Sequence, residues 1–202
     1  MSTIEPDADA DAELATVAAS AAAPGALKAG MHAPLFVLPD TSGQAVSLEK
    51  LLREGPVLLH FYRGGWCTYG EQSLADFGAT YEQVAALGAQ ALAISPDRRA
   101  GQLPSRLPVP DLYDEGLRVA RSYGLVFSLP ERLRARYRQL GYAPGEGCEW
   151  LAPLPAVYLL DRDGMVVLAL LELDYRNRFN PEPLLHALHA IQSRRATRPR
   201  LF

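Results

Sequence analysis

The chain has 202 residues, of which 49% are hydrophobic and 21% are charged, and its formal net charge at pH 7 is -3. This composition is that of an ordinary globular protein, and a charge so close to zero gives no reason to expect a nucleic-acid partner. No apolar run approaches the roughly 20 residues that a helix needs to cross a bilayer, so we expect no membrane partner either.

The N-terminal 28 residues differ in composition from the rest of the chain. They alternate Asp and Ala and then become rich in Ala, a pattern that favours a helix but supplies almost no large side chains for a core. We expect residues 1–28 to be an acidic, Ala-rich segment, either helical or disordered, ahead of one domain over residues 29–202. The first basic residue is Lys28, so the segment lacks the positive start of a signal peptide, and we expect a cytoplasmic protein.

The first half of the domain alternates short apolar runs with amphipathic segments. Residues 35–38 predict a short strand, and Ser47 is placed to cap a short helix. The run at 57–62, VLLHFY, is apolar almost throughout and predicts a strand that is buried on both faces. A helix should follow the Gly-Gly pair after this strand, with Leu74, Phe77, Tyr81 and Val84 on its apolar face.

The second half of the domain continues this alternation and then changes. Residues 89–94 predict another buried strand, and residues 116–123 predict a helix. The apolar runs 156–160 and 165–171 are joined by the turn DRDG and predict a hairpin, after which Pro181 begins the last helix. This order predicts an α/β protein with a thioredoxin-like fold, in which a central mixed β-sheet is flanked by helices on both faces.

Cys67 carries the clearest chemical signal. It follows the predicted buried strand and two glycines, and it falls just before or in the first turn of the next helix. Unpaired N–H groups and the dipole at a helix N-terminus stabilise a thiolate, and Arg63 adds positive charge nearby. Because the thiolate is the nucleophile, we expect Cys67 to be a reactive sulfur. The opposing interpretation is a buried, inert cysteine at a strand–helix junction.

The segment around this cysteine resembles the active-site stretch of the alkyl hydroperoxide reductase and thiol-specific antioxidant (AhpC/TSA) group. It reads FYRGGWCTYG, where that group commonly has FYRGGWCPYC. The stretches GLVFSLPERLRARY, PLPAVYLLDRDGMV and LDYRNRFNPE also resemble the family, so the resemblance covers about residues 30–191. It implies a thioredoxin-like fold and a peroxiredoxin-like thiol oxidoreductase in which Cys67 is the attacking cysteine and Arg63 lies beside it.

Two departures from the family pattern bear on this activity. Position 70 is Gly where the family often has a second cysteine, which excludes a C-x-x-C disulfide. His60 and Gly64 stand where true peroxiredoxins have a proline and a threonine ahead of the cysteine. Cys148, seven residues before Pro155, is the only other cysteine and is a candidate resolving thiol; we favour the alternative, regeneration by an external thiol.

The resemblance also implies a substrate site around the sulfur. Thioredoxin-fold redox proteins commonly place a cis-proline before a core strand and beside the reactive sulfur, and Leu154-Pro155 occupies that place. We predict a cis bond there, with the backbone of Leu154 exposed for substrate docking; the alternative is a trans proline that begins the strand. Trp66, Thr68 and Tyr69 flank the cysteine, and we expect them to line the same site.

Three functions remain open at this point. The first is an antioxidant enzyme in which the Cys67 thiolate attacks a hydroperoxide, becomes a sulfenic acid, and is regenerated by a thioredoxin-like or glutathione-like thiol. The second is a single-thiol disulfide reductase acting through mixed disulfides. The third is a non-catalytic thioredoxin-fold binding module, which Gly70 favours. We expect no cofactor and no metal, because no Cys/His spacing suggests a metal site, and a homodimer is an open alternative.

Overall fold

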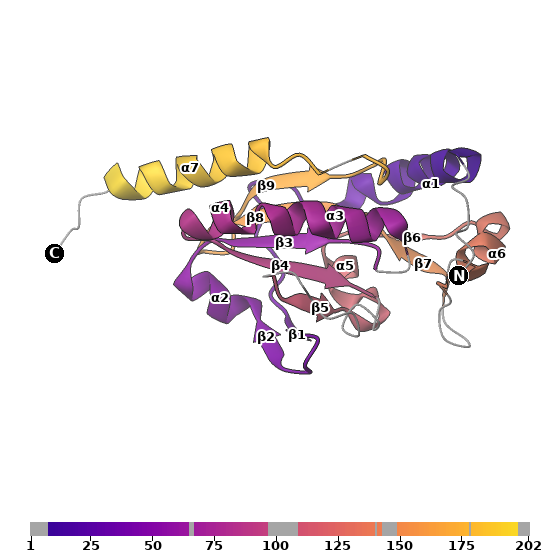
Figure 1. Ribbon diagram of the computed structural model, residues 1–202, viewed down its shortest axis with the longest axis horizontal. Coiled ribbons are helices and arrows are strands. Elements are labelled where there is room, and N and C mark those ends of the chain that lie inside the picture. The colour runs from indigo at the N-terminus through magenta and orange to yellow at the C-terminus, as the bar shows by residue number, and fades with distance from the viewer. Residues whose placement is uncertain are drawn as a thin grey trace.

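The computed structural model describes residues 8–64, 67–96, 109–139, 141–142, 149–177 and 179–197. At its centre is a five-stranded sheet with the strand order β5-β4-β3-β8-β9 (Figure 1). The strands are β3 (Val57–Phe61), β4 (Gln90–Ser95), β5 (Asp111–Tyr113), β8 (Ala156–Leu160) and β9 (Val166–Leu171). β3 runs parallel to β4 and β4 to β5, whereas β8 is antiparallel to both β3 and β9. The sheet is therefore mixed, and the predicted hairpin of β8 and β9 is confirmed.

Helices cover both faces of this sheet. They are α1 (Ala8–Ala21), α2 (Leu48–Glu54), α3 (Thr68–Ala79), α4 (Tyr81–Ala86), α5 (Arg118–Ser122), α6 (Glu131–Gln139) and α7 (Glu182–Thr197), with 3-10 turns at Ala23–Gly25 and Glu115–Leu117. Among the described residues, no helix has both the length and the apolar character that crossing a membrane requires.

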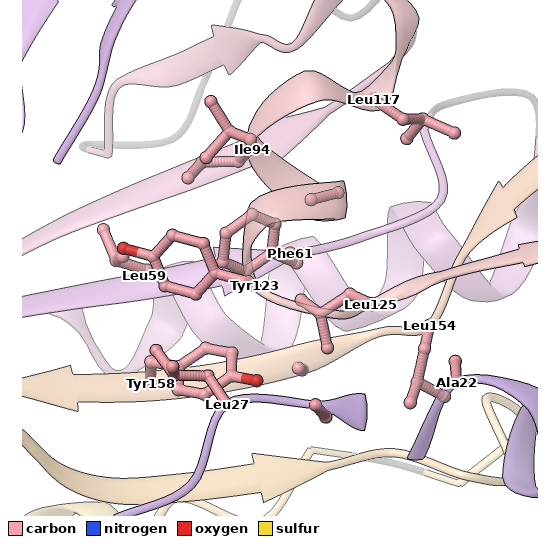
Figure 2. Packing of buried hydrophobic residues seen from close by; sticks show 14 of the residues in the cluster. Ala22, Leu27, Leu59, Phe61, Ile94, Leu117, Tyr123, Leu125, Leu154 and Tyr158 are labelled. Carbon is pink, nitrogen blue, oxygen red and sulfur yellow. The ribbon is translucent and has the colours of Figure 1, made fainter. Parts of the chain in front are cut away.

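Alternate residues of β8 show how the two faces are filled. Val157 and Leu159 join the core cluster that α3, α4 and α7 cover, whereas Tyr158 and Leu160 join the cluster that contains residues of α1 and α5. Successive side chains of a strand point to opposite faces, so a strand buried at every position needs a core on each side. Figure 2 shows part of the second cluster, where the Tyr123 ring lies between Phe61 and Tyr158, at centroid distances of 5.0 and 5.4 Å.

Some elements differ from the sequence-based expectation. The single helix expected after the Gly64-Gly65 pair, with an apolar face that extends to Val84, is two helices, because α3 ends at Ala79 and α4 begins at Tyr81. Thr80 separates them, and its hydroxyl donates to the carbonyl oxygen of Asp76 at 3.1 Å, which satisfies an acceptor at the end of α3.

Two small sheets pair β1 (Val37–Pro39) with β2 (Ala45–Ser47), and β6 (Val126–Ser128) with β7 (Leu151–Pro153). The strand expected over residues 35–38 overlaps β1, whereas β2, β6 and β7 were not predicted. Each of these three strands has three residues, which is too short for an alternating pattern to identify. The second pair matters for the site, because β7 leads directly into β8.

Part of the N-terminal segment is a helix that packs on the domain. Leu14 and Ala18 of α1 and Ala22 beyond it are all no more than 2% exposed. They join the same core cluster as Phe61 and Tyr123, so this segment supplies more core than its composition suggested. The domain boundary after residue 28 stays a prediction.

Candidate active site

Cys67 is the N-cap residue of α3, as the sequence predicted. Its backbone is extended, with φ -106° and ψ 118°, and its N–H group donates to the carbonyl oxygen of Gly64 at 3.3 Å. The cysteine side chain is 6% exposed. The first N–H groups of a helix have no partner within that helix and favour negative charge near them. A thiolate at this position therefore lies in the field of a twelve-residue helix.

The backbone around the cysteine needs glycine at two positions, one in the loop before α3 and one in the first turn of α3. Gly64 has φ +109°, a backbone conformation that side chains disfavour. Gly70 is required for a different reason: a Cβ atom there would lie 2.6 Å from the carbonyl oxygen of Gly64 and 3.6 Å from the Cβ of Cys67. The position where the family often has a second cysteine is thus closed off by backbone in this protein.

Arg63 is buried beside Cys67. Its Nη2 atom donates to the hydroxyl oxygen of Tyr137, and its Cζ lies 5.1 Å from the ring centroid of Tyr137 and 4.0 Å from that of Tyr175. Burial alone would lower the pKa of Arg63, but interactions with Cys67 and the two tyrosines outweigh burial and raise that pKa. The guanidinium therefore keeps its charge although it is only 3% exposed.

The two tyrosines do not neutralise this charge. Burial raises the pKa of Tyr137 to about 12, and burial also raises the pKa of Tyr175 above its ordinary value. Both side chains therefore contact Arg63 as neutral phenols. The positive charge remains available to a thiolate or to an oxygen that becomes negative during a reaction.

A cavity of about 320 Å³ lies next to Arg63, between α3, the segment before α7, and the sheet. Arg63 and Gly70 line it at one side, with Ser73, Pro155 and Phe179 among the other lining residues. Its size is at the lower end of the range for small-molecule sites.

His60 of β3 also lines the cavity and is neutral. Its ring stacks on Phe77 with centroids 4.7 Å apart, and its Nε2 lies 3.2 Å from the hydroxyl oxygen of Ser73. Nδ1 is buried and has no hydrogen-bond partner among the residues that the structure describes. Burial lowers the pKa of His60 to about 3, so His60 carries no charge at physiological pH.

This buried imidazole should make the fold sensitive to acid. The ordinary pKa of histidine is 6.5 and that of native His60 is about 3, so between these values the unfolded chain binds the extra proton. The free energy of unfolding should then decrease as the pH falls through this window, by at most about 1.4 kcal/mol per pH unit from this one group. Denaturant unfolding at several pH values measures the slope. His60→Phe should flatten it and exposed His189→Gln should not; equal slopes in both variants would refute the assignment.

The structure describes only some of the residues that we expected to lie around Cys67. Tyr69 is half-buried on α3, with its ring centroid 5.6 Å from that of Tyr175, so it packs near Arg63. Thr68 is the first residue of α3. Trp66 and Cys148 lie outside the described residues.

The predicted cis bond at Leu154–Pro155 is wrong. No peptide bond among the described residues is cis. The side chain of Leu154 is fully buried, and its N–H donates to the carbonyl oxygen of Leu125 at 2.6 Å. The pairing of β6 with β7 brings these two residues together, so the N–H of Leu154 is already used within the fold and is not free for docking. Pro155 does line the cavity, and its carbonyl oxygen accepts from the N–H of Glu172 at 2.9 Å.

Sequence reasoning missed the two tyrosines around Arg63. Tyr137 lies on α6, and Tyr175 lies in the segment between β9 and α7. Both belong to stretches that resemble the family, RARY and LDYRN, so a search for polar residues in those stretches could have singled them out.

Comparisons with known proteins agree with this geometry. The family model described as AhpC/TSA family matches residues 29–169. Chloroplastic peroxiredoxin Q of Oryza sativa subsp. japonica is 30% identical over 162 residues, which are 78% of this chain and 63% of the rice protein. The thiol-disulfide oxidoreductase ResA of Bacillus thuringiensis (strain Al Hakam) is 25% identical over 148 residues, which are 70% of this chain and 68% of that protein.

A solved structure supports the fold assignment. The crystal structure of peroxidoxin BcpB from Mycobacterium tuberculosis matches with a TM-score of 0.64 over 82% of this chain and 98% of that chain, at 23% sequence identity. This likeness confirms the predicted thioredoxin-like fold. Because the family model also matches well over half of the residues, the chain belongs to the AhpC/TSA family.

Proposed function

We propose that this protein is a thiol peroxidase in which Cys67 reduces a hydroperoxide and is regenerated by an external thiol. The observation that carries this proposal is the buried pair of Cys67 and Arg63 at the N-terminus of α3. A permanent positive charge and unpaired helix N–H groups both favour the thiolate, which is the form that attacks peroxide. Family membership supports the same chemistry, although the chain spans only 63% of the rice relative.

The reaction follows from these groups. The Cys67 thiolate attacks one oxygen of the hydroperoxide, the S–O bond forms as the O–O bond breaks, and the sulfur is oxidised to a sulfenic acid. The other oxygen takes the electron pair and leaves as water or an alcohol after it gains a proton. Arg63 stabilises the negative charge that develops on this leaving oxygen. An external thiol then displaces water from the sulfenic acid, and a second thiol attacks the mixed disulfide and releases Cys67.

Disulfide reduction is the second candidate, because ResA is named as a thiol-disulfide oxidoreductase. Two features of this site argue against it. The sulfur belongs to a side chain that is only 6% exposed, so a small peroxide reaches it more easily than a protein disulfide. Position 70 cannot hold a second cysteine without moving the backbone of Gly64. Gly70 would also be compatible with a non-catalytic binding module, which needs no second cysteine.

The partners that we propose are a hydroperoxide and a thioredoxin-like or glutathione-like thiol, and the compartment that we propose is the cytoplasm. Purified protein should consume hydrogen peroxide or cumene hydroperoxide when supplied with dithiothreitol, glutathione, or thioredoxin and its reductase. Reduction of insulin disulfides is measured in parallel. Peroxide turnover with little insulin reduction is expected, the reverse result would favour the reductase, and absence of both would favour the binding module.

A further inference from the structure

Helix α1 contacts both segments that supply the tyrosines around Arg63. The hydroxyl of Tyr175 donates to Oδ1 of Asp11 at 2.6 Å, across a separation of 164 residues. Glu13 pairs with Arg132 of α6, the helix that carries Tyr137. Figure 1 shows α1 and α6 at the same end of the molecule. The first helix of the chain is thus joined to both sides of the Arg63 environment.

We propose that α1 positions Arg63 through Asp11 and Tyr175. Asp11 fixes the hydroxyl end of Tyr175, and the ring of Tyr175 lies 4.0 Å from the guanidinium carbon. On another side, the hydroxyl oxygen of Tyr137 accepts from Nη2 of Arg63. In this arrangement Asp11 and Tyr175 are positioning residues, because they act on Cys67 only through Arg63. The inference rests on the proposed role of Cys67 as the reactive thiol.

The physical reason is the geometry of a cation against an aromatic face. Such a contact is attractive only while the cation stays over the ring, and it strengthens when both groups are removed from water. A hydrogen bond from the phenol to a carboxylate fixes the ring and increases its electron density. Both effects hold the Arg63 guanidinium where its charge acts on Cys67. Loss of the bond from Tyr175 to Asp11 should let the guanidinium shift and weaken its effect on the sulfur.

Other charged and titratable groups also interact with Arg63 or with Asp11. Tyr142 interacts electrostatically with Arg63, and burial raises the pKa of Tyr142. Arg176 follows Tyr175 and interacts with Asp11, but it forms its own ion pair with Asp174 at 2.6 Å. Arg176 also interacts with Tyr175, but its ion pair with Asp174 does not involve the Tyr175 hydroxyl. Tyr175 contacts Arg63 through a side-chain hydrogen bond as well as through its ring, so removal of the hydroxyl acts on Arg63 directly.

The test measures how fast iodoacetamide alkylates Cys67 across the pH range in which a thiol ionises, with peptide mass analysis to follow this cysteine alone. Tyr175→Phe and Asp11→Ala should each shift the midpoint of this profile to higher pH and slow alkylation at neutral pH by about two- to fivefold. The double variant should be no slower than Tyr175→Phe, because both changes remove one interaction. Asp11→Asn, which keeps an acceptor oxygen, should recover part of the rate.

The matched control is Glu13→Gln. It removes the ion pair between Glu13 of the same helix, whose side chain is 27% exposed, and exposed Arg132 of α6, without a change at Tyr175. Its alkylation profile should equal that of the original protein. The proposal is overturned if Asp11→Ala and Tyr175→Phe leave the midpoint unchanged, or if Glu13→Gln shifts it equally, which would indicate general loosening of α1.

The positioning role of α1 can be tested even if the protein is not a peroxidase. Alkylation needs no peroxide and no reductant, so the profiles can be compared even in a protein that turns over neither substrate. Conversely, normal peroxide turnover together with identical alkylation profiles would leave the proposed function intact and reject the role of α1.

Discussion

A Cys67→Ser protein is expected to lose peroxide consumption completely, down to the rate of the reductant alone. Serine has nearly the same size as cysteine, but its oxygen is not oxidised by peroxide, so no sulfenic acid forms. Every other feature of the site stays in place, including Arg63 and the start of α3. Peroxide consumption measured beside a thermal melt distinguishes loss of the sulfur from loss of the fold.

Cys148→Ser is the matched control for this experiment. If an external thiol regenerates Cys67, this variant should retain the original rate with dithiothreitol as reductant. Substantial activity in Cys67→Ser would refute the assignment of the attacking sulfur. Loss of activity in Cys148→Ser would instead show that the protein resolves the sulfenic acid with its own second cysteine.

Gly70→Ala is expected to destabilise the protein although alanine is the better helix former. Helix propensity alone would make the variant more stable by about 1 kcal/mol. The new Cβ, however, would lie 2.6 Å from the carbonyl oxygen of Gly64, and this neighbour is backbone that cannot rotate aside. Overpacking typically costs about 1–3 kcal/mol, so after subtraction of the gain in helix propensity we expect a net loss of up to about 2 kcal/mol, which is a fall in Tm of up to about 8 °C.

The same substitution should slow the alkylation of Cys67, because the carbonyl oxygen of Gly64 also accepts from the Cys67 N–H at 3.3 Å. Gly70→Cys should behave similarly and should not restore a C-x-x-C disulfide. Gly25→Ala is the control, because a Cβ at Gly25 meets no atom within 4 Å. A Gly70→Ala protein with a raised Tm and normal alkylation would show that the loop moves aside at little cost.

The position of Cys67 could be predicted because the pattern that places it is local. A buried strand, two glycines and an amphipathic segment follow one another, so the cysteine had to fall at the start of a helix. The central sheet was similarly accessible, since β3 and β8 are apolar at nearly every position. Strands of three residues such as β6 and β7 carry no such pattern.

The surroundings of Arg63 could not be read from the sequence in this way. Tyr137 is 74 residues away along the chain, and only the packing of α6 brings the two side chains together. The same holds for Asp11, which lies in a segment whose composition gave little reason to expect core contacts. The cis bond at Pro155 was inferred from resemblance alone, and the pairing of Leu154 with Leu125 shows a different local arrangement.

We propose that peroxide oxidises Cys67 to a sulfenic acid, which an external thiol then reduces. The most direct measurement exposes the intact protein to an equimolar amount of hydrogen peroxide with dimedone as a sulfenic acid trap, followed by peptide mass analysis without reductant. We expect a dimedone adduct on Cys67 as the main product, and loss of that adduct when dithiothreitol is added together with the trap. A Cys67–Cys148 disulfide as the main product, or an unmodified Cys67, would contradict this proposal.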